Sequence, residues 1–351
     1  EFVQGLYNGK YCYSDSMTEE QIALLRIPSG VEDIIRRMVA ENRIIFLTGN
    51  PGDGKTYLIK AIKEHLHDVF IETDMNRVRE EKIDSLMDDI ISCYEQNKPC
   101  IIAANEFPFH KLGNHFRVRS PKLYKEIIEV RRNILIYGKQ TLELKRICII
   151  DLNERNLLDK DRCIVKQILD KFTSLLQPYS GSNTTLAHNV SALASNLVQQ
   201  QILNIFSYIS MSGQHFVIRD VLGMVSHMLV SCTDPDHEGS GYYYDAMFDG
   251  SNELMSFALQ FDPILLSSPT WDEKLWNGEI TDGWQFDCPI KWPHQITKET
   301  GTVEDAVIRF KSIKRKFFFE NVFAKELMSL QPQDFSKCID ILVRIKQDPT
   351  G

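Results

Sequence analysis

The sequence lacks several features that would each indicate a class of protein. No run of apolar residues approaches the roughly 20 that a membrane-spanning helix needs. The first residues, Glu1 to Gly5, have neither the basic start nor the apolar segment of a secretory signal peptide. No internal repeat and no low-complexity tract is present. We therefore expect a globular, cytoplasmic protein that has no membrane among its partners.

The eight cysteines also lack the spacing of a metal site. No two of them form a C-x-x-C pair, and Cys100 and Cys148 lie within apolar stretches, where a reduced thiol behaves as a small apolar side chain. This usage favours a reducing compartment and argues against structural zinc. The formal net charge is −8, so the whole chain does not attract nucleic acid, and any contact with DNA would need a local basic patch.

What the sequence does contain is a complete phosphate-binding loop. Residues 49–56 read Gly-Asn-Pro-Gly-Asp-Gly-Lys-Thr and match G-x-x-x-x-G-K-[ST] at every fixed position. The apolar stretch 43–48 before the loop predicts a buried strand, and residues 57–66 after it carry apolar residues at helical spacing. In this context the backbone N–H groups and the helix N-terminus bind phosphate. The pattern predicts a nucleoside triphosphate site.

The residues of this loop have distinct expected roles. Lys55 should reach the β- and γ-phosphates, and the hydroxyl of Thr56 should bind Mg²⁺. The glycines allow the backbone to curve so that its N–H groups point inward. With ATP and Mg²⁺ as the cofactors, the expected binding residues are Gly49, Asn50, Pro51, Gly52, Asp53, Gly54, Lys55, Thr56 and Tyr57.

Strand and helix patterns alternate around the loop. The expected strands are 43–48, 69–73, 100–104 and 146–150. The expected helices begin with a capping box at Ser29 and Glu32 and continue near 82–96 and over 120–138. The alternation predicts an α/β fold of the AAA-like P-loop NTPase type, with a parallel sheet and helices on both faces.

The rest of the chain differs in character. Strand patterns stop after about residue 156, helical patterns fill 161–231, and a last helical stretch spans roughly 303–346. We therefore expect an irregular N-terminal segment, a P-loop NTPase core, a helical lid and an appended C-terminal region with insertions, which cover residues 1–28, 29–160, 161–231 and 232–351.

Polar side chains follow two of the expected strands. Asn105 and Glu106 follow one strand, and Asp151, Asn153 and Glu154 follow another. In an open parallel sheet, catalytic groups lie at the carboxyl ends of the strands. We expect Glu106 to orient the attacking water, Asp151 to bind Mg²⁺ and Asn153 to sense the γ-phosphate, and we leave open which of the two clusters forms the metal and water site. The alternative for either cluster is that it only caps its strand end and the following turn.

Two arginines are further candidates. Arg219 begins an amphipathic helix beyond the core, where a cation could fold over the γ-phosphate and couple the nucleotide to the position of the lid. Its alternative is a surface position or a pair with Asp220. Arg155 directly follows the fourth expected strand and could reach the nucleotide of a neighbouring subunit, or form a salt bridge at the strand end.

A segment near the C-terminus, residues 309–320, combines five cations with four aromatic residues. A basic patch with interleaved aromatic side chains can bind nucleic acid. At helical spacing, however, Phe310, Ile313 and Phe317 fall on one face. We expect these three side chains to pack inward and the cations to form a solvated outer face.

Five segments together carry a family resemblance: the phosphate loop with Leu47 and Thr48, Ala103 to Glu106, Asp151 to Leu157, Ile218 to Leu222, and Lys314 to Glu320. They resemble the AAA-like NTPases of prokaryotic anti-phage defence, and among these the DptF-like ATPases of DNA phosphorothioation-dependent restriction. The resemblance implies ATP hydrolysis that drives or switches a multi-protein restriction system. Its implied partners are the other proteins of that system, with DNA and further copies of the chain as candidates. The sequence departs from a plain AAA pattern at Asn105, where Asp is more usual.

Two other functions remain open. One is a nucleotide-dependent scaffold or assembly switch with little turnover, and the other is a small-molecule kinase. The first would bind ATP without needing a group that orients water, and the second would need an acceptor site that the sequence does not identify.

Overall fold

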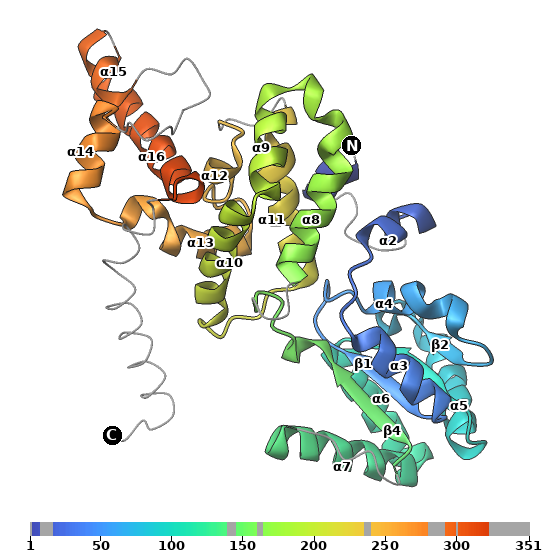
Figure 1. Cartoon of the computed structure of the whole chain (residues 1–351). Helices are drawn as coiled ribbons and strands as arrows, with labels where there is room; N and C mark the ends of the chain where they lie inside the picture. The colour runs from blue at the N-terminus through green and yellow to red at the C-terminus, as the bar shows by residue number, and fades with distance from the viewer. Residues whose placement is uncertain are drawn as a thin grey trace, which may run out of the picture.

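The computed structural model describes residues 2–7, 17–138, 145–159, 164–234, 240–279, 292–299 and 301–322. An α/β core and a region of packed helices lie at opposite ends of the molecule, and the start of helix α11, Ile218–Val230, reaches the phosphate loop between them (Figure 1). None of the helices in these ranges combines the length and the apolar character required to cross a lipid bilayer.

The core sheet has four parallel strands in the order β2-β3-β1-β4. Their bounds are Ile44–Thr48 for β1, Phe70–Glu72 for β2, Cys100–Ala103 for β3 and Ile147–Asp151 for β4. Strand β1 lies between β3 and β4, and its Ile44 is opposite Cys100 on one side and Ile147 on the other. Every residue of β1 is buried, which explains why its sequence is apolar without alternation.

Helices cover both faces of the sheet, as the sequence predicted. Their bounds are Val31–Ala40 for α3, Lys55–Ile62 for α4, Glu80–Glu95 for α5, Glu106–Arg119 for α6 and Pro121–Tyr137 for α7. Successive strand residues point to opposite faces. Ile44 and Phe46 accordingly pack with α5, α6 and α7, whereas Ile45 and Leu47 pack with α3 and α4. The predicted P-loop NTPase type of α/β fold is confirmed.

The helix ends follow local chemistry, with one difference from the prediction. Helix α7 begins at Pro121 and ends before Gly138, which has a φ of 62°. At α3, Ser29 donates hydrogen bonds to the Glu32 carboxylate from both its backbone N–H and its hydroxyl. The N-cap is nevertheless Gly30, in the left-handed conformation, so the predicted Ser29 cap was wrong by one residue.

The helical region surrounds the largest apolar core of the described residues. Its main helices are α8 Ile164–Leu176, α9 Thr184–Ala194, α10 Asn196–Ser210 and α11 Ile218–Val230. The N-terminal segment, predicted to be irregular, contains α1 Phe2–Tyr7 and α2 Glu19–Leu25. Val3 and Leu6 of α1 are buried in the same core as α11. The capping box of Thr18 and Gln21 was the local signal for α2.

Short helices occupy much of the stretch that the sequence suggested was loop. They are α12 Tyr243–Ala246, α13 Glu253–Ala258, α14 Pro269–Asn277 and α15 Pro293–Glu299. The last described helix, α16, spans Val303–Glu320. It accounts for the first part of the predicted 303–346 helical stretch, and residues 323–346 lie outside the described ranges.

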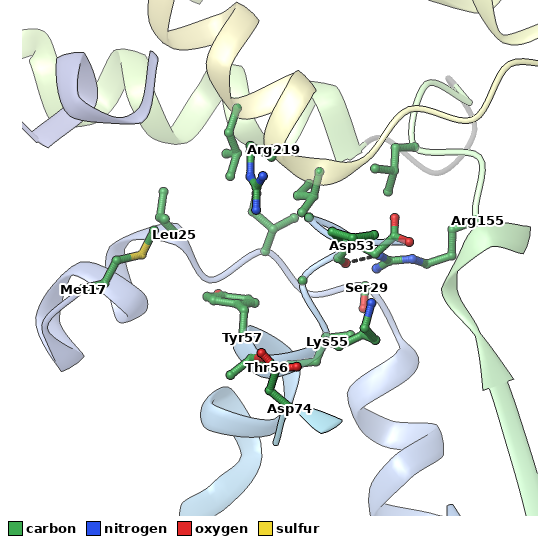
Figure 2. Close-up of a pocket in the computed structure, with 18 of the residues that line it drawn as sticks. Met17, Leu25, Ser29, Asp53, Lys55, Thr56, Tyr57, Asp74, Arg155 and Arg219 are labelled. Carbon is green, nitrogen blue, oxygen red and sulfur yellow. Dashed lines mark hydrogen bonds between the residues drawn. The ribbon is translucent and has the colours of Figure 1, made fainter. Parts of the chain in front are cut away.

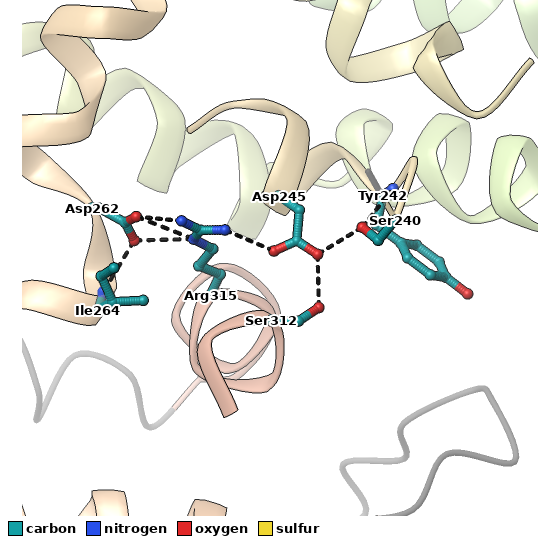
Figure 3. A network of polar contacts seen from close by, with 7 residues as sticks. All are labelled: Ser240, Tyr242, Asp245, Asp262, Ile264, Ser312 and Arg315. Atoms are coloured by element: carbon teal, nitrogen blue, oxygen red, sulfur yellow. Dashed lines mark hydrogen bonds and ion pairs between the residues drawn. The ribbon is translucent and has the colours of Figure 1, made fainter. Parts of the chain in front are cut away.

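The basic segment on α16 is built into the protein interior. Ile313 and Phe317 are buried, as predicted, and Phe310 is partly buried. The expected solvated face of cations was wrong for the three consecutive cations, because Lys314 and Lys316 are only 2% and 3% exposed. Arg315 forms ion pairs with Asp262 and Asp245, to which its Nη1 donates at 3.0 Å (Figure 3). These cations hold α16 in place.

Candidate functional site

The phosphate loop joins β1 to α4, and its glycines are required by the close approach of other groups. Gly49 has a φ of 142°, and a Cβ there would lie 2.7 Å from Asp53 Oδ2. Gly52 has a φ of 98°, and a Cβ there would lie 3.0 Å from Cγ2 of Val217. Both positions exclude other residues by conformation and by space. The loop is therefore a narrow backbone cradle that helix α11 packs against.

Lys55, the first residue of α4, is 9% exposed. Its Nζ donates to the carbonyls of Gly49 and Asn50, at 2.9 and 2.8 Å. Burial lowers the pKa of Lys55, and the carboxylates of Asp53 and Asp74 oppose that shift. The lysine thus lies inside the curve of the loop, where the phosphates of a nucleotide are expected.

A cavity of about 500 Å³ opens beside the loop. The predicted residues Pro51 through Tyr57 all line it, whereas Gly49 and Asn50 contribute their carbonyls to Lys55 instead. Figure 2 shows Met17 and Leu25 on one side of Tyr57 and Lys55 and Arg155 on the other. The cavity also has many apolar wall residues, namely Leu6, Met17, Leu25, Ile27, Leu157, Ile164, Ile218 and Leu222. A ligand with an anionic end and an apolar ring fits this lining.

Asp74 belongs to this cavity, although sequence reasoning gave it no role. It follows β2 and caps a short 3₁₀ helix, η3 Met75–Arg77, by accepting a hydrogen bond from the N–H of Asn76 at 3.0 Å. Thr56 Oγ1 donates to the carbonyl of Thr73, the residue before Asp74, at 3.1 Å. The available signal was an expected strand that ended at an aspartate. The structure places this carboxylate beside the threonine expected to bind Mg²⁺ (Figure 2).

The structure separates Asn105 from Glu106. Asn105 lines the cavity and is the N-cap of α6. Glu106 is not among the lining residues, and its Oε2 accepts a hydrogen bond from Arg131 of α7 at 2.9 Å. The Glu106 carboxylate is therefore paired with α7 and is not part of the cavity wall. The water-orienting role of Glu106 stays a prediction.

Asp151 and Asn153 support the loop from the side of β4. Asp151 caps the 3₁₀ helix η4 Leu152–Glu154 by accepting from the N–H of Asn153 at 3.0 Å. Asn153 Oδ1 in turn accepts from the N–H of Asn50 at 3.0 Å. Neither residue lines the cavity, so the capping alternative describes the contacts of Asp151. Their metal-binding and sensing roles stay predictions.

Both candidate arginines line the cavity. Arg219, the second residue of α11, has its guanidinium carbon 3.5 Å from the position that a Cβ on Gly52 would occupy. Arg155 donates to the carbonyl of Asp53 in its own phosphate loop (Figure 2). Asp220 accepts from the N–H of Val217 at 3.0 Å and so completes the start of α11. Arg219 thus lies beside the phosphate loop, and its role in closing a lid over the γ-phosphate stays a prediction.

The protein groups present fit a magnesium nucleotide better than a metal held by protein alone. In the described part of the chain, no group of three or more His, Cys, Asp or Glu residues is arranged to hold a metal ion. Mg²⁺ keeps several waters and is usually bound through one or two protein oxygens together with substrate phosphates. Thr56 and Asp74 offer such oxygens beside the loop.

Comparison with protein families agrees with this site. Residues 45–162 match the family described as "ATPase family associated with various cellular activities (AAA)". Searches of curated proteins and of solved structures find no match. The matched stretch begins in β1, includes the phosphate loop and all the other strands, and ends after Arg155. Together, the loop, the parallel sheet and the family match make residues 45–162 an AAA-like P-loop NTPase domain.

Proposed function

We propose that this chain hydrolyses ATP in an Mg²⁺-dependent reaction and uses that reaction to drive or switch a multi-protein anti-phage DNA restriction system. The observation that carries the ATPase proposal is the cavity of about 500 Å³ beside the phosphate loop, which Lys55 and Thr56 line. The restriction system, the cytoplasmic location, and the DNA and protein partners rest on the sequence resemblance.

The residues around the loop divide into groups with different tasks. The backbone of residues 52–54 and Lys55 would hold the phosphates, and Thr56 would ligate the metal. Bound Mg²⁺ supplies positive charge that stabilises the phosphates during transfer. The apolar wall, which includes Met17, Leu25 and Leu222, would enclose the nucleoside and exclude water from that end.

We assign the carboxylate next to the metal to Asp74. It lines the cavity beside Thr56 and pairs with Arg77 of the same turn at 3.4 Å, whereas Glu106 pairs with Arg131 of α7 and does not line the cavity. A positioned carboxylate can hold a metal-bound water or accept a proton from the attacking water. Asp151 lies close enough to affect the pKa of Lys55 and so adds negative charge near the site.

The second candidate function, a nucleotide-dependent switch with little turnover, is favoured by a specific contact. The Glu106 carboxylate that the sequence suggests for water activation is held by Arg131 at 2.9 Å. If no other carboxylate replaces it, the chain would bind ATP and change its contacts without rapid hydrolysis. Arg219 and Leu222 of α11 would report the bound nucleotide to the helical region in either case.

Phosphate release from Mg²⁺-ATP by the purified chain tests the proposal. We expect release without any added acceptor, which would exclude the kinase function, and we expect duplex DNA to increase the rate. Binding of a non-hydrolysable analogue with negligible phosphate release under all conditions would favour the switch. Failure to bind ADP or the analogue, measured by calorimetry, would reject both functions.

Mass measurement in the two nucleotide states addresses assembly. A change of mass between the ADP-bound and analogue-bound chain would support a homo-oligomer whose formation depends on the nucleotide. No change, together with DNA-stimulated turnover, would favour an output that acts on DNA or on other proteins of the restriction system.

A further inference from the structure

The start of α11 and the loop before it pack against the phosphate loop. A Cβ on Gly52 would lie 3.0 Å from Cγ2 of Val217, and a Cβ on Gly54 would lie 3.4 Å from Cγ2 of Ile218. These contacts join the helical region to the nucleotide site through van der Waals packing. They leave no space for the phosphate loop to shift toward α11 while the helical region stays in place.

One polar contact strengthens this junction. His215 Nε2 lies 3.0 Å from Asp53 Oδ1, and the side chain of Asp53 is 0% exposed. The other carboxylate oxygen of Asp53 accepts from the N–H of Asn50 at 2.6 Å. Asp53 therefore links a residue of the helical region to the backbone at the start of the phosphate loop.

The same loop segment carries Lys55. The carbonyl of Asn50 accepts from Lys55 Nζ at 2.8 Å, and the carbonyl of Asp53 accepts from Arg155. A buried carboxylate is electrostatically unfavourable unless hydrogen-bond donors satisfy its oxygens. The Asn50 N–H and the His215 ring contact the two oxygens of the Asp53 carboxylate and so meet this requirement.

We propose that His215 is a positioning residue for nucleotide binding, which holds the phosphate loop in its binding shape through Asp53 and so couples that loop to the helical region. This inference rests on the proposed nucleotide site but goes beyond it, because His215 does not line the cavity and contacts no expected ligand group. A shift of the loop before α11 would release Asp53 and loosen the loop. The affinity for nucleotide and the position of the helical region are therefore linked.

The test compares nucleotide affinity in single and double variants of the full chain. His215→Ala should weaken the binding of Mg²⁺-ADP and of a non-hydrolysable ATP analogue by about tenfold, or about 1.4 kcal/mol. His215→Gln retains an N–H donor and should stay within about threefold of the wild type. Asp53→Ala should weaken binding, and adding His215→Ala to it should cause no further loss.

His188→Ala is the matched control. His188 Nε2 pairs with the Glu320 carboxylate at 2.8 Å in the helical region, far from the phosphate loop in sequence. This variant should lower the melting temperature and leave the nucleotide affinity unchanged. A merely structural role for His215 would produce the same result as the control.

The outcomes separate the two proposals. If the wild type binds no nucleotide, the proposed function fails and the role of His215 fails with it. If the wild type binds but His215→Ala binds equally well, or if the losses in the double variant add, only the role of His215 is overturned. Weaker binding by His215→Ala, rescue by glutamine and non-additive losses would establish it.

Discussion

The nucleotide cavity and the buried network on α16 use the same residue types with opposite results. On α16, Arg315 is surrounded by the carboxylates of Asp262 and Asp245, so its charge is matched within the protein (Figure 3). At the cavity, Lys55 donates to backbone carbonyls of its own loop and not to a carboxylate. Asp74 pairs with Arg77 at 3.4 Å, and both side chains still line the cavity. A matched charge stabilises the fold, whereas a charge that faces a cavity can bind a ligand.

The largest effect should follow from removing the cavity lysine. Lys55→Ala should weaken Mg²⁺-ATP analogue binding by at least about 100-fold, or about 2.7 kcal/mol, because a charge that contacts two phosphates is lost. Calorimetric titration measures the change. Lys63→Ala, which removes an exposed cation just beyond α4, should leave the affinity unchanged. Equal affinity in wild type and Lys55→Ala would contradict the site.

Removing a matched cation should affect stability instead. Arg315→Ala should reduce the free energy of unfolding by about 3–5 kcal/mol, since it leaves two carboxylates without their cation in the interior. Denaturant titration measures it. The exposed Lys311 on the same helix is the control and should change stability little. Folded Arg315→Ala should still bind nucleotide with wild-type affinity. Weaker binding would contradict the view that Arg315 acts on stability alone.

Two acids at strand ends can be compared in the same way. Asp74→Asn should reduce the rate of ATP hydrolysis by about 100-fold, because a neutral amide neither accepts a proton nor attracts the metal. Glu106→Gln should change it by less than about threefold, as the Glu106 side chain pairs with Arg131. Steady-state kinetics measure the hydrolysis rates of both variants, once each is shown to bind the non-hydrolysable analogue with wild-type affinity. The reverse ranking would restore Glu106 as the group that orients water.

The smallest effect concerns a helix end distant from the cavity. Hydrogen bonds from Thr302 lower the pKa of Asp305 in the capping box of α16. The stabilisation from Asp305 is therefore present above its unfolded pKa of about 3.9 and is lost as the pH falls through the lower folded value. Thr302→Ala should raise that pKa, measured by NMR titration, and lower the melting temperature at pH 7 by about 2–4 °C. An unchanged pKa of Asp305 in Thr302→Ala would contradict the capping contact.

Local patterns predicted much of the core correctly. The apolar run of β1, the phosphate loop and the Pro121 and Gly138 ends of α7 each depend on neighbouring residues in the chain, so the sequence contains the information for them. The helices of the N-terminal segment were missed because they are short, and α1 is buried by packing against distant residues, among them those of α11.

The candidate site was predicted in part for the same reason. Residues 51–57 line the cavity as expected, because a continuous loop carries them all. Asp74 and His215 were missed, since Asp74 reaches the cavity from the end of β2 and His215 reaches Asp53 from the helical region. The cations at 314–316 of α16 were misjudged because Asp262 and Asp272 come from other helices and turns, and helical periodicity contains no information about such partners.

The sequence by itself determined that a glycine-rich loop between a buried strand and a helix would present backbone N–H groups, Lys55 and Thr56 to phosphate, because these features depend on residues a few positions apart. Tertiary structure alone decided that Asp74 lies in the cavity while Glu106 pairs with Arg131, and that Asp53 is linked to His215. These contacts depend on strand order and on how the helical region packs against the core, which local periodicity does not specify.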